Sequence, residues 1–148
     1  MSLEERLVDE MKQAMKSNDK LRLSTIRMIR TAVKNKEIDQ RKKLDDDEIL
    51  RVIQGMVRKS EESIEQFGAG GRADLVEKET KEMEVLKSYL PQSLSRDEVA
   101  KIIDETILET QSSSLKDLGK VMKAVMPKLT GKADGKVINQ LVKERLSP

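Results

Sequence analysis

The sequence predicts an all-α protein with an elongated N-terminal domain of four helices and a compact C-terminal domain of three helices. Apolar residues recur at helical spacing nearly throughout the 148 residues, and no convincing run alternates apolar with polar residues. Charged residues make up 38% of the chain and hydrophobic residues 36%. The apolar side chains must therefore be concentrated on one face of each helix, and the regular pattern argues against disorder.

The first four helices follow from apolar spacing and from the residues that break each helix. Ser17-Asn18-Asp19 separates the first two helices, and Asn18 or Asp19 can cap the second. The acidic run at 45–48 suits the first turn of the third helix, because the helix dipole favours negative charge there. Three glycines within 68–71 end the third helix, and Pro91 ends the fourth. The predicted helices cover about 3–16, 19–36, 45–66 and 72–89.

A domain boundary is expected at Pro91-Gln92-Ser93-Leu94, which divides the chain into residues 1–92 and 93–148. Ser95 and Glu98 have the spacing of a capping box, which predicts a fifth helix over about 96–110. The serines at 112–114 form a linker or cap before a sixth helix, which Pro127 ends or kinks. A glycine-containing loop then precedes a seventh helix with apolar residues from 137 to 146.

The composition excludes several classes of chemistry. The chain has no Cys and no His, so it lacks the usual zinc ligands, cysteine nucleophiles and proton shuttles of neutral pH. One Tyr, one Phe and no Trp are too few aromatic rings for a platform on which single-stranded bases stack. The acids at 45–48 lack the spacing of a calcium loop, and we expect neither a metal nor a cofactor.

Apolar runs and the first residues of the sequence indicate where the protein is located. No stretch approaches the roughly 18 consecutive apolar residues of a membrane span. The first five residues lack a basic region followed by an apolar core, so no secretory signal is expected. We therefore expect a cytoplasmic protein with no membrane partner.

Basic residues are concentrated in two segments, although the net charge is only +2. Residues 113–148 hold eight basic residues against three acidic ones, and Lys116, Lys120 and Lys123 lie opposite the apolar stripe of the sixth helix. Clustered lysines bind nucleic acids by releasing condensed counterions from the phosphates. A secondary basic face on the second helix consists of Arg27, Arg30 and Lys34. Either stripe can instead be an ordinary solvated face, and acids near the second helix favour that interpretation there.

The loop before the seventh helix is a further candidate for phosphate binding. Lysines and glycines alternate there, just before a helix N-terminus whose free N–H groups attract anions. These residues are Lys128, Gly131, Lys132, Gly135 and Lys136. The spacing is not that of a P-loop. Asp134 can simply cap the helix while the glycines make the turn, and this role is compatible with lysines that bind phosphate.

No pair of residues is convincing as a catalytic acid and base, and no catalytic residue is predicted. Ser112-Ser113-Ser114 superficially resembles the serines of amidases, but nothing around it resembles an amidase domain, so we interpret it as a linker. The glutamates of the fourth helix are interpreted as a solvated face paired with neighbouring lysines. They are Glu77, Glu79, Glu82 and Glu84, with Lys78, Lys81 and Lys87 as partners.

Several sequence blocks in this order resemble the YqeY-like family over essentially the whole chain. The blocks are Gly71-Arg72-Ala73-Asp74-Leu75-Val76-Glu77-Lys78-Glu79, Tyr89-Leu90-Pro91-Gln92, Leu115-Lys116-Asp117-Leu118-Gly119-Lys120-Val121-Met122 and Gly131-Lys132-Ala133-Asp134-Gly135-Lys136-Val137. The resemblance implies an N-terminal helical domain and a C-terminal three-helix domain. The latter is similar to the tail of the GatB subunit of the glutamyl/aspartyl-tRNA amidotransferase. The residues that match the motif region of that tail are Gly119, Lys120, Lys123, Gly131, Lys132, Ala133 and Lys136.

In that enzyme family the tail looks like a tRNA-binding appendage, and a related module is joined to some glutaminyl-tRNA synthetases. The resemblance also implies a carbon–nitrogen ligase activity with glutamine as amido-N-donor, but this chain lacks the ATP-using and amidase parts. Our first hypothesis is a stand-alone tRNA-binding or amidotransferase-associated module that is not catalytic by itself. The alternatives are a protein-interaction module that docks on an aminoacyl-tRNA synthetase or amidotransferase, and a glutamine-dependent ligase.

Overall fold

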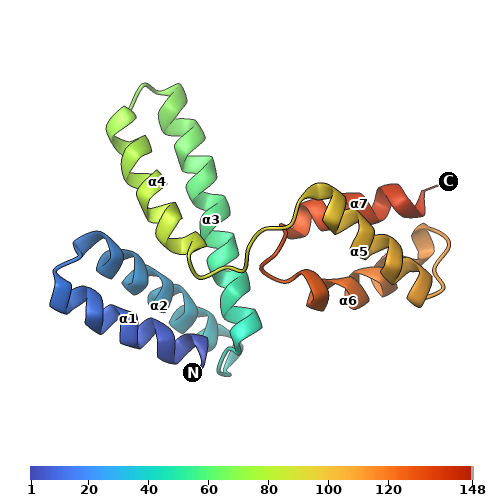
Figure 1. Ribbon diagram of the computed structural model, residues 1–148, viewed down its shortest axis with the longest axis horizontal. Helices are drawn as coiled ribbons and strands as arrows, with labels where there is room; N and C mark the ends of the chain where they lie inside the picture. The colour runs from blue at the N-terminus through green and yellow to red at the C-terminus, as the bar shows by residue number, and fades with distance from the viewer. Residues whose placement is uncertain (148) are drawn as a thin grey trace. The chain divides into compact units, whose positions relative to one another are not determined.

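A computed structural model describes residues 1–147 and divides them into two compact units, with the division after Leu90. The described residues contain seven α-helices, one 3-10 turn and no strand, which confirms the predicted all-α fold (Figure 1). The division lies two residues before the predicted boundary. No helix within residues 1–147 is long and apolar enough to cross a lipid bilayer.

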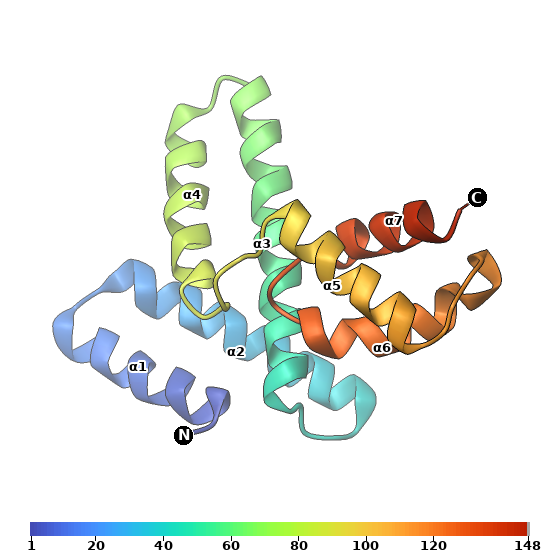
Figure 2. The same cartoon turned by 45° about the vertical axis from the view of Figure 1, so that its right-hand side comes forward.

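The N-terminal unit consists of two helical pairs. Helices α1 (Leu3–Ser17) and α2 (Lys20–Gln40) pack against each other, and so do α3 (Asp46–Ala69) and α4 (Ala73–Lys87), as both views show (Figures 1 and 2). Helix α2 also contacts α3 and α4, so the two pairs share one core. The side chains at the centre of this core are Leu7, Ile26, Ile29, Ile49, Ile53 and Leu86.

Local caps determine where these helices begin. The Asp19 carboxylate accepts a hydrogen bond from the Arg22 N–H at 3.1 Å and starts α2. Asp45 and Glu48 form a reciprocal capping box at the start of α3, where the acidic run predicted the first turn of a helix. Gly71, after the end of α3, has φ +72°, a backbone conformation that favours glycine.

The C-terminal unit contains α5 (Arg96–Glu109), a 3-10 turn η1 (Leu115–Asp117), α6 (Leu118–Leu129) and α7 (Gly135–Leu146). Each of the three α-helices packs against the other two, and they bury a separate apolar core. That core consists of Val99, Ile103, Val121, Val125, Leu129, Ile138, Leu141, Val142 and Leu146.

Two details refine the sequence-based expectation. Pro127 lies inside α6, which continues to Leu129. The last turn persists because Leu129 is fully buried and the Thr130 hydroxyl donates to the Met126 carbonyl at 2.7 Å. The segment before α6 forms the separate turn η1, which is capped by Ser114 through a hydrogen bond from the Lys116 N–H.

Candidate nucleic-acid interface

Helix α6 presents two lysines to solvent. Lys120 and Lys123 are exposed and lie opposite the stripe of Val121, Val125 and Leu129, which is completely buried. The helix contains no acidic residue. Its outer face therefore carries positive charge that no residue of the same helix neutralises.

Helix α7 adds a second pair of exposed lysines. Arg145 reaches Asp104 of α5 at 3.2 Å, which places α5 on that side of α7. Lys136 and Lys143 are nine and two positions from Arg145, and so lie about 180° and 160° around the helix from it. Both lysines therefore face away from α5. Lys143 was not among the predicted binding residues, although its spacing of seven residues from Lys136 places both on one face of the helix.

The two remaining candidate lysines lie in the connections. Lys116 belongs to η1 and Lys132 to the loop before α7, and both are exposed. The Leu94 N–H donates to the Lys132 carbonyl at 3.0 Å, which fixes this loop. Gly131 adopts φ +77°, so glycine is needed there for the turn itself.

Lys128 has a different role from the other lysines. Its ammonium group forms an ion pair with Glu109 of α5 at 2.7 Å and donates to the Thr106 hydroxyl at 3.0 Å. Lys123, five positions away, lies about 140° around α6 from Lys128 and so points away from α5. Lys128 therefore joins α5 to α6, and its charge is already compensated.

The acidic residues of 113–147 also form contacts within the C-terminal unit. Asp134 caps α7 by accepting from the Lys136 N–H at 2.8 Å, so a carboxylate already sits at the helix N-terminus where a phosphate was expected. Gly135 is the first residue of α7, and a Cβ there would meet no atom within 4 Å. Hydrogen bonds from the backbone N–H groups of Ser113 and Ser114 lower the pKa of Asp117, and the charge of Lys120 adds to this. Glu144 pairs with Arg96 of α5 at 3.6 Å.

These contacts separate the charges of the C-terminal unit. Five acidic residues belong to α5, whereas six exposed lysines on η1, α6, α7 and the loop have no ion-pair partner within residues 1–147. We call these six the hairpin lysines. They are Lys116, Lys120, Lys123, Lys132, Lys136 and Lys143.

The secondary basic face on α2 has acidic neighbours. Arg27, Arg30 and Lys34 are exposed, and the Arg30 guanidinium contacts the Met11 sulfur at 3.4 Å. Arg30 and Lys34 border a small recess that is also lined by Glu4 and Glu37. The structure thus brings this face next to carboxylates that partly offset its charge.

The expectation of a fully solvated glutamate face on α4 is wrong for Glu82. Glu77 does pair with Lys81 at 3.0 Å on the exposed side of the helix. Glu82, however, is only 8% exposed, because it lies four residues before Leu86 on the face that packs against the rest of the unit. Burial raises the pKa of the Glu82 carboxyl, Glu79 raises it further, and Lys78 opposes them.

No arrangement in the described chain supports a metal site or covalent catalysis. Residues 1–147 contain no group of three or more Asp, Glu, His or Cys side chains placed to hold a metal ion. The serines at 112–114 cap and brace the α5–α6 connection, where the Thr110 and Ser112 hydroxyls lie 2.7 Å apart. The C-terminal unit therefore offers binding through charge, with no catalytic constellation in the described residues.

Comparison with known proteins identifies the family. The family model described as "Yqey-like protein" matches residues 4–146. The chain belongs to the YqeY-like family. The match extends across both units, so the helical architecture of this YqeY-like chain is described by one family model.

Fungal relatives carry the name "Altered inheritance of mitochondria protein 41, mitochondrial". The protein from Lachancea thermotolerans is 41% identical over 87 residues, which is 58% of this chain and 46% of the relative. The protein from Pyrenophora tritici-repentis is 30% identical over 142 residues, or 94% of this chain and 78% of the relative. The protein from Kluyveromyces lactis is 36% identical over 111 residues, or 72% of this chain and 60% of the relative.

These relatives correct the expected location. They are named as mitochondrial proteins, which contradicts the prediction of a cytoplasmic protein and points to mitochondria. The prediction rested on the lack of a secretory signal and of a membrane span in the sequence, and neither feature distinguishes these two compartments. The match covers about half the length of the Lachancea protein.

Proposed function

We propose that the C-terminal unit is a tRNA-binding module that grips the phosphate backbone of folded RNA through the hairpin lysines. The observation that carries the proposal is the separation of charge within this unit. Most of its acidic residues belong to α5 or cap a helix or turn, while six exposed lysines form no ion pair within residues 1–147. Lysines of this kind bind phosphate groups favourably, because each contact releases counterions that had condensed on the nucleic acid.

The same surface favours folded RNA over single strands. The unit has no aromatic residue on which an unpaired base could stack, since Tyr89 and Phe67 both belong to the N-terminal unit. Recognition would therefore depend on backbone charge and shape, which is how double-helical RNA is usually bound. The similarity of this segment to the tail of an amidotransferase subunit makes tRNA the preferred substrate class.

The test is a salt titration of tRNA binding to the full chain. The triple variant Lys120→Gln, Lys123→Gln and Lys136→Gln removes three charges without adding repulsion. We expect affinity at low salt to fall on the order of tenfold to a hundredfold, and the slope of log K against log salt to become shallower by about two to three. Fluorescence anisotropy with total tRNA measures both quantities.

A matched variant separates a local surface from overall charge. Lys12, Lys16 and Lys87 are exposed lysines of the N-terminal unit, and changing all three to Gln removes the same total charge. This control is expected to keep the salt slope of the unaltered chain. An equal loss in both triple variants would show that net charge alone attracts RNA, and the proposal would fail.

Docking on a tRNA-charging enzyme or an amidotransferase is a second candidate function. Its support is the exposure of Met15, Met28 and Ile38 on α1 and α2, which are 52%, 46% and 64% accessible. Exposed apolar residues that do not form one large patch are common on soluble proteins. This support is weaker than the charge separation of the C-terminal unit. A stable complex with the purified partner enzyme in the absence of RNA would favour docking instead.

A glutamine-dependent ligase remains the third candidate. The observation in its favour is that Glu79 and Glu82 line one groove of the N-terminal unit and that the pKa of Glu82 is raised by burial and by Glu79. The groove is also lined by Ser24, Ser60 and Ser63, but within residues 1–147 none of their hydroxyl groups forms a hydrogen bond with a side chain that could act as a base. Release of ammonia from glutamine by the purified chain would be required to support this activity.

A further inference from the structure

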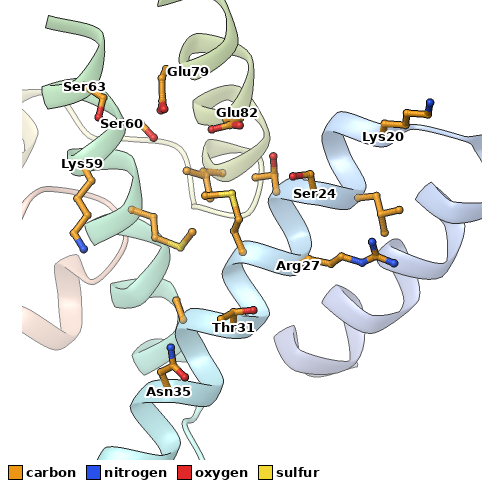
Figure 3. Close-up of a pocket in the computed structure, with 16 residues that line it drawn as sticks. Lys20, Ser24, Arg27, Thr31, Asn35, Lys59, Ser60, Ser63, Glu79 and Glu82 are labelled. Atoms are coloured by element: carbon orange, nitrogen blue, oxygen red, sulfur yellow. The ribbon is translucent and has the colours of Figure 1, made fainter. Parts of the chain in front are cut away.

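A large groove of the N-terminal unit lies between α2 and the α3–α4 pair. It encloses about 840 Å³, a volume in the range typical of small-molecule sites. Apolar side chains from three helices line it, namely Leu23, Met28 and Ala32 of α2, Met56 of α3 and Leu86 of α4. Polar and charged residues lie along its sides (Figure 3).

One end of the groove carries acidic and hydroxyl groups. Ser60 of α3 and Glu79 and Glu82 of α4 are drawn together there, with Ser24 of α2 on the opposite wall (Figure 3). Glu82 and Ser60 are each only 8% exposed. Within residues 1–147, neither side chain forms a hydrogen bond or an ion pair.

The Glu82 side chain is mostly buried, and a charge in such a place costs free energy when no cation pairs with it. Its carboxylate oxygens are not fully buried, so they can be reached from the groove. Burial and the negative charge of Glu79 both disfavour ionised Glu82, and Lys78 compensates only in part. Lys20, Arg27 and Lys59 also line the groove, but none of them forms an ion pair with either glutamate. The groove thus offers carboxylate and hydroxyl acceptors that form no ion pair with the basic side chains of residues 1–147.

We propose that this groove binds a small organic cation, with its ammonium group between Glu79, Glu82 and Ser60 and its apolar part against Met28, Met56 and Leu86. Two carboxylates and a hydroxyl supply three acceptors for the three N–H donors of a primary ammonium group. The methionines suit an aliphatic body, because their flexible side chains adapt to its shape. The site belongs to the N-terminal unit and does not depend on RNA binding by the C-terminal unit.

The test follows amide chemical shifts of the full, isotope-labelled chain during titration with hexylammonium chloride. We expect saturable shifts confined to residues around the groove. Hexanol has the same apolar chain without the charge, and we expect its affinity to be lower by at least about tenfold. Equal binding of the alcohol, or shifts that map outside the groove, would overturn the proposal.

Substitutions on one helix supply the matched controls. Glu82→Gln keeps the shape of the side chain and should weaken hexylammonium binding by about tenfold or more. Glu84→Gln removes an exposed carboxylate of the same helix and should leave binding unchanged. Equal weakening by both variants would indicate a general charge effect and contradict the site.

A third variant covers the case in which Glu82→Gln fails to fold. Met28 is 46% exposed on the groove wall, so Met28→Lys should be tolerated and should block binding with its own ammonium group. Unchanged binding by Met28→Lys would overturn the proposal. A lysine-containing peptide, acetyl-Leu-Lys-Leu-amide, is the last probe. If it bound more than about tenfold tighter than hexylammonium, the groove would belong to a protein partner and not to a small ligand.

Discussion

Two carboxylate sites of the N-terminal unit differ in whether the protein supplies the counter-charge. Glu10 accepts hydrogen bonds from the Arg6 guanidinium at 2.7 Å, the Arg22 guanidinium at 2.9 Å and the Tyr89 hydroxyl at 3.3 Å. Glu82 is more deeply buried than Glu10 and has no such donor among the described residues. The first site is complete and holds α1, α2 and Tyr89 together, whereas the second is the proposed cation site.

The same distinction divides the lysines of the C-terminal unit. Lys128 is compensated by Glu109 and Thr106 and joins two helices. Lys120 and Lys123 have no ion-pair partner within residues 1–147 and are exposed. Charges whose partners lie in the chain contribute to stability, and charges without partners are available for binding. Each prediction below tests this separation.

The largest effect is expected for Glu10→Gln. The substitution removes the negative charge between two guanidinium groups that also lie over the Tyr89 ring, at 4.9 Å for Arg6 and 5.8 Å for Arg22. The free energy of unfolding should fall by about 1–2 kcal/mol at neutral pH, as for hydrogen bonds to charged groups that are partly exposed. Urea denaturation followed by the fluorescence of Tyr89, the single tyrosine, measures it.

The pH dependence of this effect has a definite sign. Burial raises the pKa of Glu10, but hydrogen bonds from Arg22 and Arg6 outweigh burial and lower the pKa below its usual value. The stabilisation is therefore present above the pKa of the unfolded chain and is lost as pH falls through the lowered value. Asp9→Asn, on the exposed side of α1, is the control and should change stability little at any pH.

Glu82→Gln should have the opposite effect on stability. Burial and then Glu79 raise the pKa of Glu82 above its usual value, so ionisation costs the folded state. The penalty is absent below the pKa of the unfolded chain and complete above the raised pKa. Removing the charge should stabilise the unliganded protein by about 1 kcal/mol at neutral pH, with the gain disappearing in acid. A loss of stability at neutral pH would show that Glu82 has a partner and that the two carboxylate sites are alike.

The sequence predicts much of the fold because helix signals are local. Asp19 acts as a predicted cap, the acidic run at 45–48 lies at the start of α3, and Gly71 and Gly131 adopt positive φ in the expected turns. Each signal depends on residues within one helical turn. The sequence left open whether Pro127 ends or kinks α6, because the continuation to Leu129 depends on burial of that residue by the other helices of the unit.

The candidate sites were less predictable, because pairing is a tertiary property. Lys128 and Lys123 look equivalent in sequence, and only the position of Glu109 across the helical pair distinguishes them. Likewise, Glu82 resembles its neighbours on α4 until the packing of α2 and α3 buries it. The spacing of Glu82 and Leu86 on one helix face was a signal, but charge alone suggested a solvated residue.

Lys128→Met and Lys123→Met separate structure from binding within one helix. Loss of the exposed Lys128–Glu109 pair should lower the free energy of unfolding by less than about 1 kcal/mol and leave tRNA affinity almost unchanged. Lys123→Met should leave the free energy of unfolding unchanged and weaken tRNA affinity several-fold, as expected for the loss of one phosphate contact. Chemical denaturation and tRNA anisotropy on both variants measure the two effects. If both variants lost tRNA affinity equally, Lys128 would have to leave Glu109 and bind RNA.

The smallest effect is expected for the secondary basic face of α2. Arg27→Gln, Arg30→Gln and Lys34→Gln together remove the same charge as the triple variant of the C-terminal unit. Glu4 and Glu37 border the recess beside Arg30 and Lys34, so part of this charge is already offset before RNA arrives. We therefore expect tRNA affinity to change by less than about threefold, with an unaltered salt slope. If the slope of log K against log salt became shallower by two or more, α2 would belong to the RNA interface. The presence of nearby carboxylates would then not separate charges that stabilise the fold from charges that bind RNA.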